Sequence, residues 1–305
     1  MKKRIWRLFP IIFFTVGISV MGQEQSRAKV TELATLLNHV GERVKTFYLD
    51  LQKFAWTDTV RQQQLRDDRT PQGKPSDLVY DMIIRIDPAV PRAGVPPPPP
   101  PFFTKNISEL ISVDGKPGQK GESPQRSDPK AGEIDLLWIL LWAPRREDHS
   151  YEFSFAGRAE LEGRKTLMVD VTYSPRLYSV GPMNAVKDVD LNRVPSVVWQ
   201  GDSFAVLVQQ TGRIWIDPDT YDVLQLETRT KPFEFEKPGG GKLKFEVAMT
   251  ARFHSMTFEN PRQTLMVPES IETVQTTKGM QPPLVRTTHT FGNFKRFAAD
   301  VKINP

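Results

Sequence analysis

Hydrophobic and polar residues alternate along most of the chain, and residues 211–230 show how the alternation is interrupted. Ile214 and Ile216 alternate with bulkier or charged neighbours, as in a strand with two unlike faces. The sequence Asp-Pro-Asp-Thr at 217–220 then favours a type I turn, because proline presets φ and aspartate accepts hydrogen bonds from the turn backbone. Alternation resumes through Leu226. This stretch therefore predicts a β-hairpin with a well-specified register.

Similar alternation predicts further strands, and the clearest period of two runs from Leu243 to His254. The predicted strands cover residues 52–65, 78–86, 102–113, 151–173 (as a hairpin), 197–199, 204–208, 265–276 and 284–297. Residues 70–75 are predicted to form a turn and residues 174–195 a loop, because both are rich in turn-forming residues. About ten or eleven strands result, joined mainly by hairpins, which favours an antiparallel sheet.

The N-terminal part of the chain has a different period. From Gln25 to about Asp50, apolar residues recur at intervals of three and four and predict an amphipathic helix with one apolar stripe. The stripe consists of Val30, Leu33, Leu37, Val40, Val44, Phe47, Leu51 and Phe54. A coiled coil is the alternative, but the stripe is short and β-rich sequence follows, so we expect the helix to pack on the sheet.

Residues 133–142, Glu-Ile-Asp-Leu-Leu-Trp-Ile-Leu-Leu-Trp, form a nearly continuous apolar segment. Ten residues are too few to span a bilayer, so the segment is predicted to be a short buried helix or a buried strand. Its side chains belong either to ordinary core or to the lining of an apolar pocket. For the second case, the candidate ligand-binding residues are Leu137, Trp138, Leu141 and Trp142.

Two stretches interrupt the strands and are predicted to be loop insertions. Residues 87–101 contain the unbroken run Pro96–Pro101, which favours extended polyproline II. A ligand for a proline-recognising domain is the alternative to an external loop. Residues 114–132 are rich in Gly, Pro, Lys and Ser and predict a second loop.

Residues 1–22 have the layout of a secretory signal peptide: four basic residues within the first seven, an apolar run and small residues before the predicted cleavage site after Gly22. An uncleaved anchor helix is the alternative. Removal of the signal leaves 37 basic against 36 acidic residues, so the high pI is weak evidence for nucleic-acid binding. The chain has no cysteine, and hence neither disulfides nor a lipidation site after the signal. We expect a single domain over residues 23–305, periplasmic and without a transmembrane segment.

Together these elements predict a mainly β protein with one N-terminal helix. A long sheet with one apolar face tends to curl. A curved antiparallel sheet, or half-open barrel, wrapped round the N-terminal helix and a short inner apolar helix at 133–142 would bury all three apolar surfaces.

The order of elements resembles the LolA-like family, which includes the periplasmic lipoprotein carrier LolA, the acceptor LolB and the regulator RseB. The most specific part is Gly-Arg-Ile-Trp-Ile-Asp-Pro-Asp-Thr at 212–220 followed by Val-Leu-Gln-Leu-Glu at 223–227. The resemblance spans most of residues 25–300. It implies a half-open barrel whose concave face holds an acyl chain, a related lipid or a lipoprotein segment.

No residue pattern in the sequence points to a reaction. Gly201-Asp-Ser-Phe-Ala lacks the last glycine of a nucleophile elbow, and the four histidines have no ligand spacing. Asp217 and Asp219 could bind a cation, but turn formation already accounts for them. We therefore expect no catalysis, cofactor, metal or nucleic-acid partner. A protein-interaction module of the RseB kind, with an envelope protein as partner, is the second hypothesis, and a hydrolase with an unrecognised site is the third.

Overall fold

The computed structural model describes residues 17–51, 53–87, 103–118, 151–180, 195–200, 203–259, 262–278 and 284–297. The predicted apolar segment at 133–142, the polyproline run and most of the second predicted loop lie outside these residues, as does most of the predicted signal peptide.

One helix and thirteen strands make up the described chain. Helix α1 spans Gly17–Leu51. The first five strands are β1 (Phe54–Leu65), β2 (Pro71–Asp87), β3 (Phe103–Val113), β4 (Lys116–Pro117) and β5 (Tyr151–Leu161). The next four are β6 (Arg164–Val180), β7 (Ser196–Gln200), β8 (Ser203–Ile216) and β9 (Val223–Thr230). The last four are β10 (Phe233–Glu236), β11 (Lys242–Glu259), β12 (Arg262–Lys278) and β13 (Leu284–Arg296).

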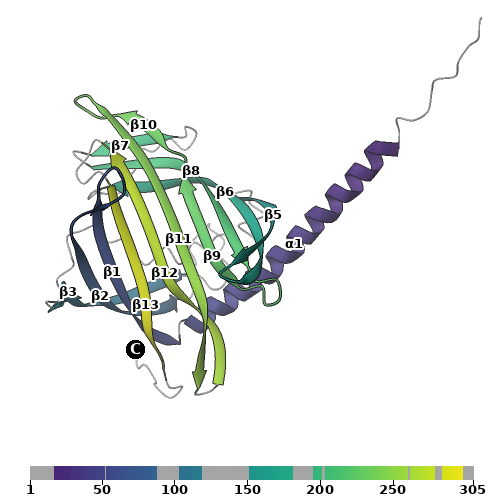
Figure 1. Cartoon of the computed structure of the whole chain (residues 1–305), viewed down its shortest axis with the longest axis horizontal. Helices are drawn as coiled ribbons and strands as arrows, with labels where there is room; N and C mark the ends of the chain where they lie inside the picture. Colours follow the sequence, from purple (N-terminus) through teal and green to yellow (C-terminus); the bar gives the residue numbers. More distant parts are fainter. Residues whose placement is uncertain are drawn as a thin grey trace, which may run out of the picture.

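All strands belong to one antiparallel sheet that is curved and not closed (Figure 1). The main order is β4-β3-β2-β1-β13-β12-β11-β9-β8-β6-β5, while β7 adds to β8 and β10 adds to β11. Neighbours in the sheet are mostly consecutive in sequence, as the hairpin pattern predicts. Strand β6 pairs with β8, and β9 pairs with β11, because β7 and β10 lie off the main path. The one long-range exception among the described strands is the pairing of β1 with β13, which joins the first and last strands in the middle of the sheet. The predicted mainly β fold with a curved antiparallel sheet and an N-terminal helix is confirmed.

The predicted hairpin at 211–230 is formed by β8, β9 and the turn between them. Ile214 lies opposite Leu226, and Trp215 lies opposite Gln225. The register shifts between Trp215 and Ile216, where Ile216 pairs with Val223. This bulge lets both Val223 and its neighbour Leu224 be buried, although strict alternation would place them on opposite faces.

Helix α1 begins eight residues earlier than predicted, and only its C-terminal half lies against the sheet. Its N-terminal half projects beyond the sheet edge (Figure 1). In the half that packs, the predicted stripe is confirmed: Leu37, Val40, Val44 and Leu51 are buried. We call the side of the sheet that faces α1 the inner face.

The inner face carries two apolar clusters at different heights along the strands. The larger cluster joins α1 to the middle and lower part of the sheet and includes Val40, Ile214 and Phe253. The smaller cluster lies where β7 and β10 add to the sheet. It is largely aromatic, with ring centroids 5.1–5.9 Å apart between Phe204 and each of Phe235, Phe245 and Trp199. These aromatic contacts hold the β7–β8 and β10–β11 pairs together.

Two predictions about loops are wrong, and proline explains both. Residues 71–75 belong to β2, because Pro75 falls where the pairing with β1 slips between Gln62 and Gln64, so no ladder hydrogen bond is lost. Residues 174–180 belong to β6, because Pro175 sits in a bulge between Tyr173 and Arg176.

Two short strands were also missed by the sequence patterns. β10 has only four residues and pairs with the start of β11, across the turn that contains the predicted Pro-Gly-Gly-Gly sequence. β4 has two residues and pairs with the end of β3, inside the stretch predicted as a loop. Elements of this length fall below what a period of two can identify.

Candidate functional site

A belt of buried and partly buried polar side chains crosses the inner face between the two apolar clusters. Thr228 on β9 lies opposite Met249, which lies opposite Thr273, which in turn lies opposite Thr287. One step up the strands, Gln210 on β8 lies opposite Thr230. Residues opposite each other in antiparallel strands share a face, so these side chains form one continuous surface. We call Gln210, Thr228, Thr230, Thr273 and Thr287 the polar belt.

Gly212 makes room for an aromatic ring at the edge of the belt. A methyl group at this position would lie 2.6 Å from the carbonyl oxygen of Glu227 and 3.0 Å from the hydroxyl of Tyr173. Tyr173, on the neighbouring strand β6, can therefore cross β8 closely at this point. The close approach places a phenol hydroxyl beside the belt.

Two polar atoms of the belt are buried without a hydrogen-bond partner within the described part of the chain. They are the side-chain oxygen Oε1 of Gln210 and the hydroxyl oxygen of Thr228, on side chains of residues that are 2% and 3% exposed. By contrast, the hydroxyl of Thr230 accepts a hydrogen bond of 2.9 Å from the backbone N–H of Val247. Buried polar groups without partners are rare, because each costs about 1–3 kcal/mol.

A buried acid–imidazole pair lies below the belt, where the first and last strands meet. Nδ1 of His289 is 2.9 Å from Oδ2 of Asp58, and the side chains are only 5% and 3% exposed. The imidazole stacks on Phe291, with ring centroids 6.2 Å apart. The prediction of a histidine satisfied by the structure fits His289, and the pair links β1 to β13.

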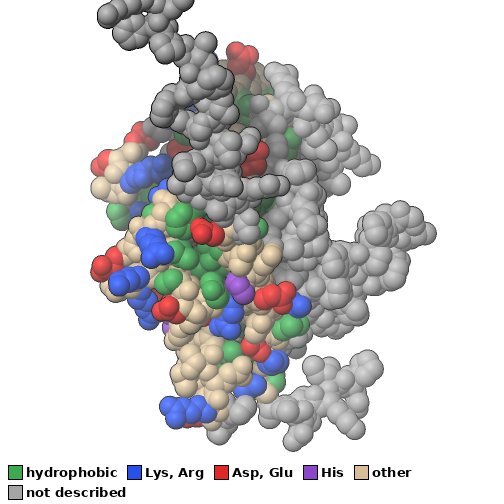
Figure 2. Space-filling model, turned by 90° about the vertical axis from the view of Figure 1, so that its right-hand side faces the viewer, with side chains coloured by type: hydrophobic (Ala, Val, Ile, Leu, Met, Phe, Trp, Pro, Cys, Tyr) green, Lys and Arg blue, Asp and Glu red, His purple; other side chains and the backbone are tan. Residues whose placement is uncertain are grey.

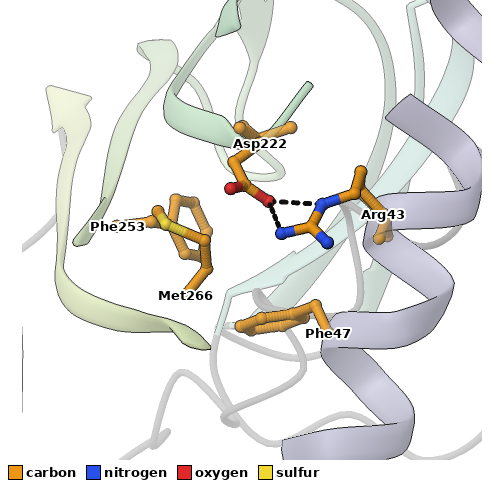
Figure 3. A pocket seen from close by; sticks show the side chains of 7 residues that line it. Arg43, Phe47, Asp222, Phe253 and Met266 are labelled. Carbon is orange, nitrogen blue, oxygen red and sulfur yellow. Dashed lines mark hydrogen bonds and ion pairs between the residues drawn. The ribbon is translucent and has the colours of Figure 1, made fainter. Parts of the chain in front are cut away.

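A shallow cleft, partly open to solvent, lies between α1 and the lower end of the sheet (Figure 3). Its walls are apolar and consist of Val44, Phe47, Val223, Phe253 and Met266. Phe47 and Phe253 meet edge to face, with ring centroids 6.0 Å apart. The space inside the cleft that a water-sized group can occupy is about 20 Å³, so the cleft has room for about one such group and is far smaller than pockets that enclose whole small molecules.

An ion pair closes one side of the cleft. Nε and one terminal nitrogen of Arg43, on α1, lie 2.9 and 2.8 Å from Oδ1 of Asp222 (Figure 3). Next to it, His39 of α1 stacks on Tyr221, with ring centroids 4.7 Å apart. The turn of the β8–β9 hairpin is therefore fastened to the helix by two contacts.

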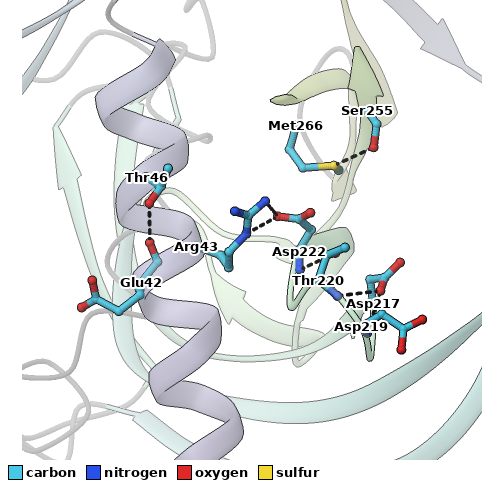
Figure 4. Close-up of polar contacts among 9 residues, drawn as sticks. All are labelled: Glu42, Arg43, Thr46, Asp217, Asp219, Thr220, Asp222, Ser255 and Met266. Carbon is cyan, nitrogen blue, oxygen red and sulfur yellow. Dashed lines mark hydrogen bonds and ion pairs between the residues drawn. The ribbon is translucent and has the colours of Figure 1, made fainter. Parts of the chain in front are cut away.

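The turn itself is held by side-chain hydrogen bonds (Figure 4). The carboxylate of Asp217 accepts hydrogen bonds from the backbone N–H groups of Asp219 and Thr220. The hydroxyl of Thr220 accepts one from the N–H of Asp222. The role in turn formation that the sequence predicts for Asp217 is thus observed, and the turn aims Asp222 at the helix.

The described residues contain no group of three or more His, Asp or Glu side chains that could hold a metal ion. No helix among them is long and apolar enough to cross a bilayer. His39 is exposed, His254 is partly buried on the opposite face, and His289 is paired with Asp58, so the described histidines do not meet in one cleft.

The four predicted ligand-binding residues, Leu137, Trp138, Leu141 and Trp142, lie outside the described residues and stay a prediction. The polar belt was missed. Its threonines and Gln210 lie in or next to different predicted strands, where each is an ordinary polar residue. Only the cross-strand register brings them together. A signal was present in Gln210 and Thr230, which interrupt apolar runs at inward-facing positions.

No family model matches the chain, and no curated protein matches it. Among solved structures, it is similar to a domain described as that of an outer membrane lipoprotein-sorting protein from Vibrio parahaemolyticus, at 9% identity and a TM-score of 0.37, covering 86% of this chain and 92% of that one. It is also similar to a DUF1329 family protein from Desulfovibrio piger, at 10% identity and a TM-score of 0.34, covering 88% and 93%.

A third similar structure is the MucA/MucB complex of Pseudomonas aeruginosa, at 9% identity and a TM-score of 0.21, with coverage of 85% of this chain and 99% of that one. Likenesses of this size carry no argument about function.

Proposed function

We propose that the protein is a non-catalytic periplasmic binding protein that holds a lipid, an acyl chain or a lipoprotein segment against the inner face of its half-open barrel. The observation that carries the proposal is the apolar cleft between α1 and the sheet, with the Arg43–Asp222 ion pair at its side. An apolar wall with a charged border suits an amphiphile, whose chain and head need different surroundings.

The hydrophobic effect supplies enough free energy for such a ligand. Each buried methylene contributes about 0.8 kcal/mol, so a long acyl chain gains on the order of 10 kcal/mol before the entropy of association is subtracted. The cleft accommodates only part of such a chain. We propose that Leu137, Trp138, Leu141 and Trp142 contact the remainder.

Mass spectrometry of lipids that co-purify with the protein from native envelopes tests this function. We expect a lipid at a fixed ratio to protein, and a marked loss of it in the Trp138→Ala, Trp142→Ala double variant. Trp215→Ala is the matched control, since Trp215 lies on the other face of β8. Lipid-free protein from native envelopes, or an equal loss in the control, would contradict the proposal.

The open edge of the sheet favours a second candidate, a protein-interaction module. β5 ends the sheet, and within the described chain no strand pairs with its outer edge. Phe155 on this strand is 52% exposed. Figure 2 shows hydrophobic side chains gathered among charged ones on the side of the molecule that carries α1 and β5. A partner's strand could add to such an edge by backbone hydrogen bonds.

Pull-down from envelope extracts separates the two candidates. An interaction module retains its protein partner when Trp138 and Trp142 are changed to Ala, and loses it when Phe155 is changed to Lys. A lipid-binding protein shows the opposite sensitivity, because its ligand does not depend on the edge of β5.

A further inference from the structure

The polar belt contains a pair of buried polar atoms whose hydrogen bonds a ligand could complete. Oε1 of Gln210 and the hydroxyl of Thr228 are nearly closed off from water and have no partner among the described residues. An unmade buried hydrogen bond destabilises the fold, and native proteins keep few of them. Such groups are more common where a bound molecule supplies the missing partner.

The two atoms are placed to serve the same molecule. Gln210 lies directly opposite Thr230, and Thr228 lies two residues along β9 on the same face. Side chains in this diagonal relation on neighbouring strands are close enough for both to contact the same ligand group. The hydroxyl of Thr230, which lies next to both along the sheet, already accepts a hydrogen bond from the backbone N–H of Val247, so the belt holds satisfied and unsatisfied groups side by side.

The surroundings of the pair define the chemistry that it would recognise. Apolar clusters lie on both sides of the belt along the strands, and the belt itself contains no charged side chain. The buried ionisable pair on the inner face, Asp58 and His289, is bonded to itself. A charged ligand group would therefore be desolvated without compensation, which is unfavourable by several kcal/mol.

We infer that the inner face binds an apolar chain that carries an uncharged hydrogen-bonding group, an amide in the first place, and that Gln210 and Thr228 recognise this group. The amide N–H donates to Oε1 of Gln210, and the Thr228 hydroxyl donates to the amide carbonyl. An ester lacks the N–H and leaves Gln210 unsatisfied. This inference rests on the proposed function, since it specifies the ligand of the same inner face.

Displacement of bound pyrene from the purified, delipidated protein tests the inference. Pyrene is a hydrocarbon without hydrogen-bonding groups, so its binding reports the apolar surface alone. Palmitamide and methyl palmitate then compete with it. We expect palmitamide to bind about 3- to 10-fold more tightly than methyl palmitate, the effect of one added buried hydrogen bond.

Two variants locate the preference. Gln210→Leu and Thr228→Val should bring the ratio of the two affinities close to one, while pyrene binding stays within about twofold. Both variants remove an unsatisfied buried group, so their thermal midpoints should equal or exceed that of the wild type. Gln225→Leu is the matched control: Gln225 is also buried, but on the other face of the hairpin and bonded to Glu227, and it should keep the preference.

The outcomes separate the inference from the function on which it rests. Failure of pyrene and of both palmitoyl compounds to bind contradicts the proposed function, and the inference with it. Binding of both compounds with equal affinity, or a preference that survives both variants, overturns the inference but not the proposed function. A trapped water molecule would then be the hydrogen-bond partner of Oε1 of Gln210 and of the Thr228 hydroxyl. A lower thermal midpoint in both variants, with the preference unchanged, assigns them a structural role.

Discussion

Breaking the buried pair between Asp58 and His289 should destabilise the protein more than any exposed ion pair would. The two side chains are 3% and 5% exposed, and their atoms are 2.9 Å apart. In His289→Leu, the Asp58 carboxylate stays buried and loses this hydrogen bond. Removal of one partner of a buried pair costs about 3–5 kcal/mol. Since domains of ordinary stability unfold with about 5–15 kcal/mol, the loss is about a fifth of the total or more.

The double variant Asp58→Leu, His289→Leu should behave differently from either single variant. With both groups replaced by apolar side chains of similar size, no uncompensated buried group remains, and the surrounding wall is already apolar through Val60, Ile271 and Phe291. Buried pairs replaced in this way often lose little stability. We expect the double variant to unfold within about 1–2 kcal/mol of the wild type.

Urea denaturation followed by tryptophan fluorescence measures all four proteins of this double-mutant cycle. The slopes with denaturant must agree before free energies are compared, because a changed slope signals a changed unfolded or folded state. Single variants that each lose less than about 1 kcal/mol would refute the reasoning. A double variant whose loss equals the sum of the two single losses would refute it as well.

Three further predictions concern other contacts. Gly212→Ala should lower the free energy of unfolding by about 1–3 kcal/mol in urea, because the added methyl meets backbone 2.6 Å away. Arg43→Met should cost about 0.5–1 kcal/mol and speed amide hydrogen exchange in the turn that carries Asp222, since the ion pair is partly exposed. The hydrogen bonds from Arg61 hold the pKa of Asp77 below its usual 3.8. The wild type should therefore be more stable than Arg61→Met above pH 4, and this difference should shrink as acid protonates Asp77 in the folded protein. A series of thermal midpoints measured at different pH values tests this.

Each of these has its own control or contrary result. Gly292→Ala, where no atom lies within 4 Å of the added methyl, should leave stability unchanged or slightly higher. Equal loss at the two glycines would mean that steric contact is not the cause. Unchanged exchange in the turn after Arg43→Met would show that the His39–Tyr221 stack alone fastens it. A stability difference for Arg61→Met that grows in acid would reverse the assigned sign.

Local patterns in the sequence were sufficient for most of the fold. The hairpin of β8 and β9 follows from alternation and an Asp-Pro turn, and both features act between near neighbours. The stripe on α1 was likewise recognised because Leu37, Val40 and Val44 obey the helical period. Pro75 and Pro175 misled the assignment, since proline usually ends strands and here occupies bulges that only the pairing register reveals.

The candidate site was less accessible to this reasoning. Asp58 and His289 are 231 residues apart in sequence, and nothing local to either one indicates the other. Gln210 and Thr228 each look like an ordinary polar position in a strand. They become noteworthy only when the sheet register places them on the inner face with water excluded. Burial and cross-strand pairing are properties of the assembled sheet, so no pattern of single strands contains them.

The pairing of β1 with β13 also determines how the protein can reach its folded state. Strand β1 has a neighbour on one side as soon as β2 is made, but its other side waits for a strand more than 200 residues later. Until then, two incomplete half-sheets each present a bare hydrogen-bonding border at what will become the centre of the molecule. Late, long-range closure slows folding and exposes such borders to neighbouring chains. We therefore expect the chain to need protection by chaperones until its last strand has paired with β1.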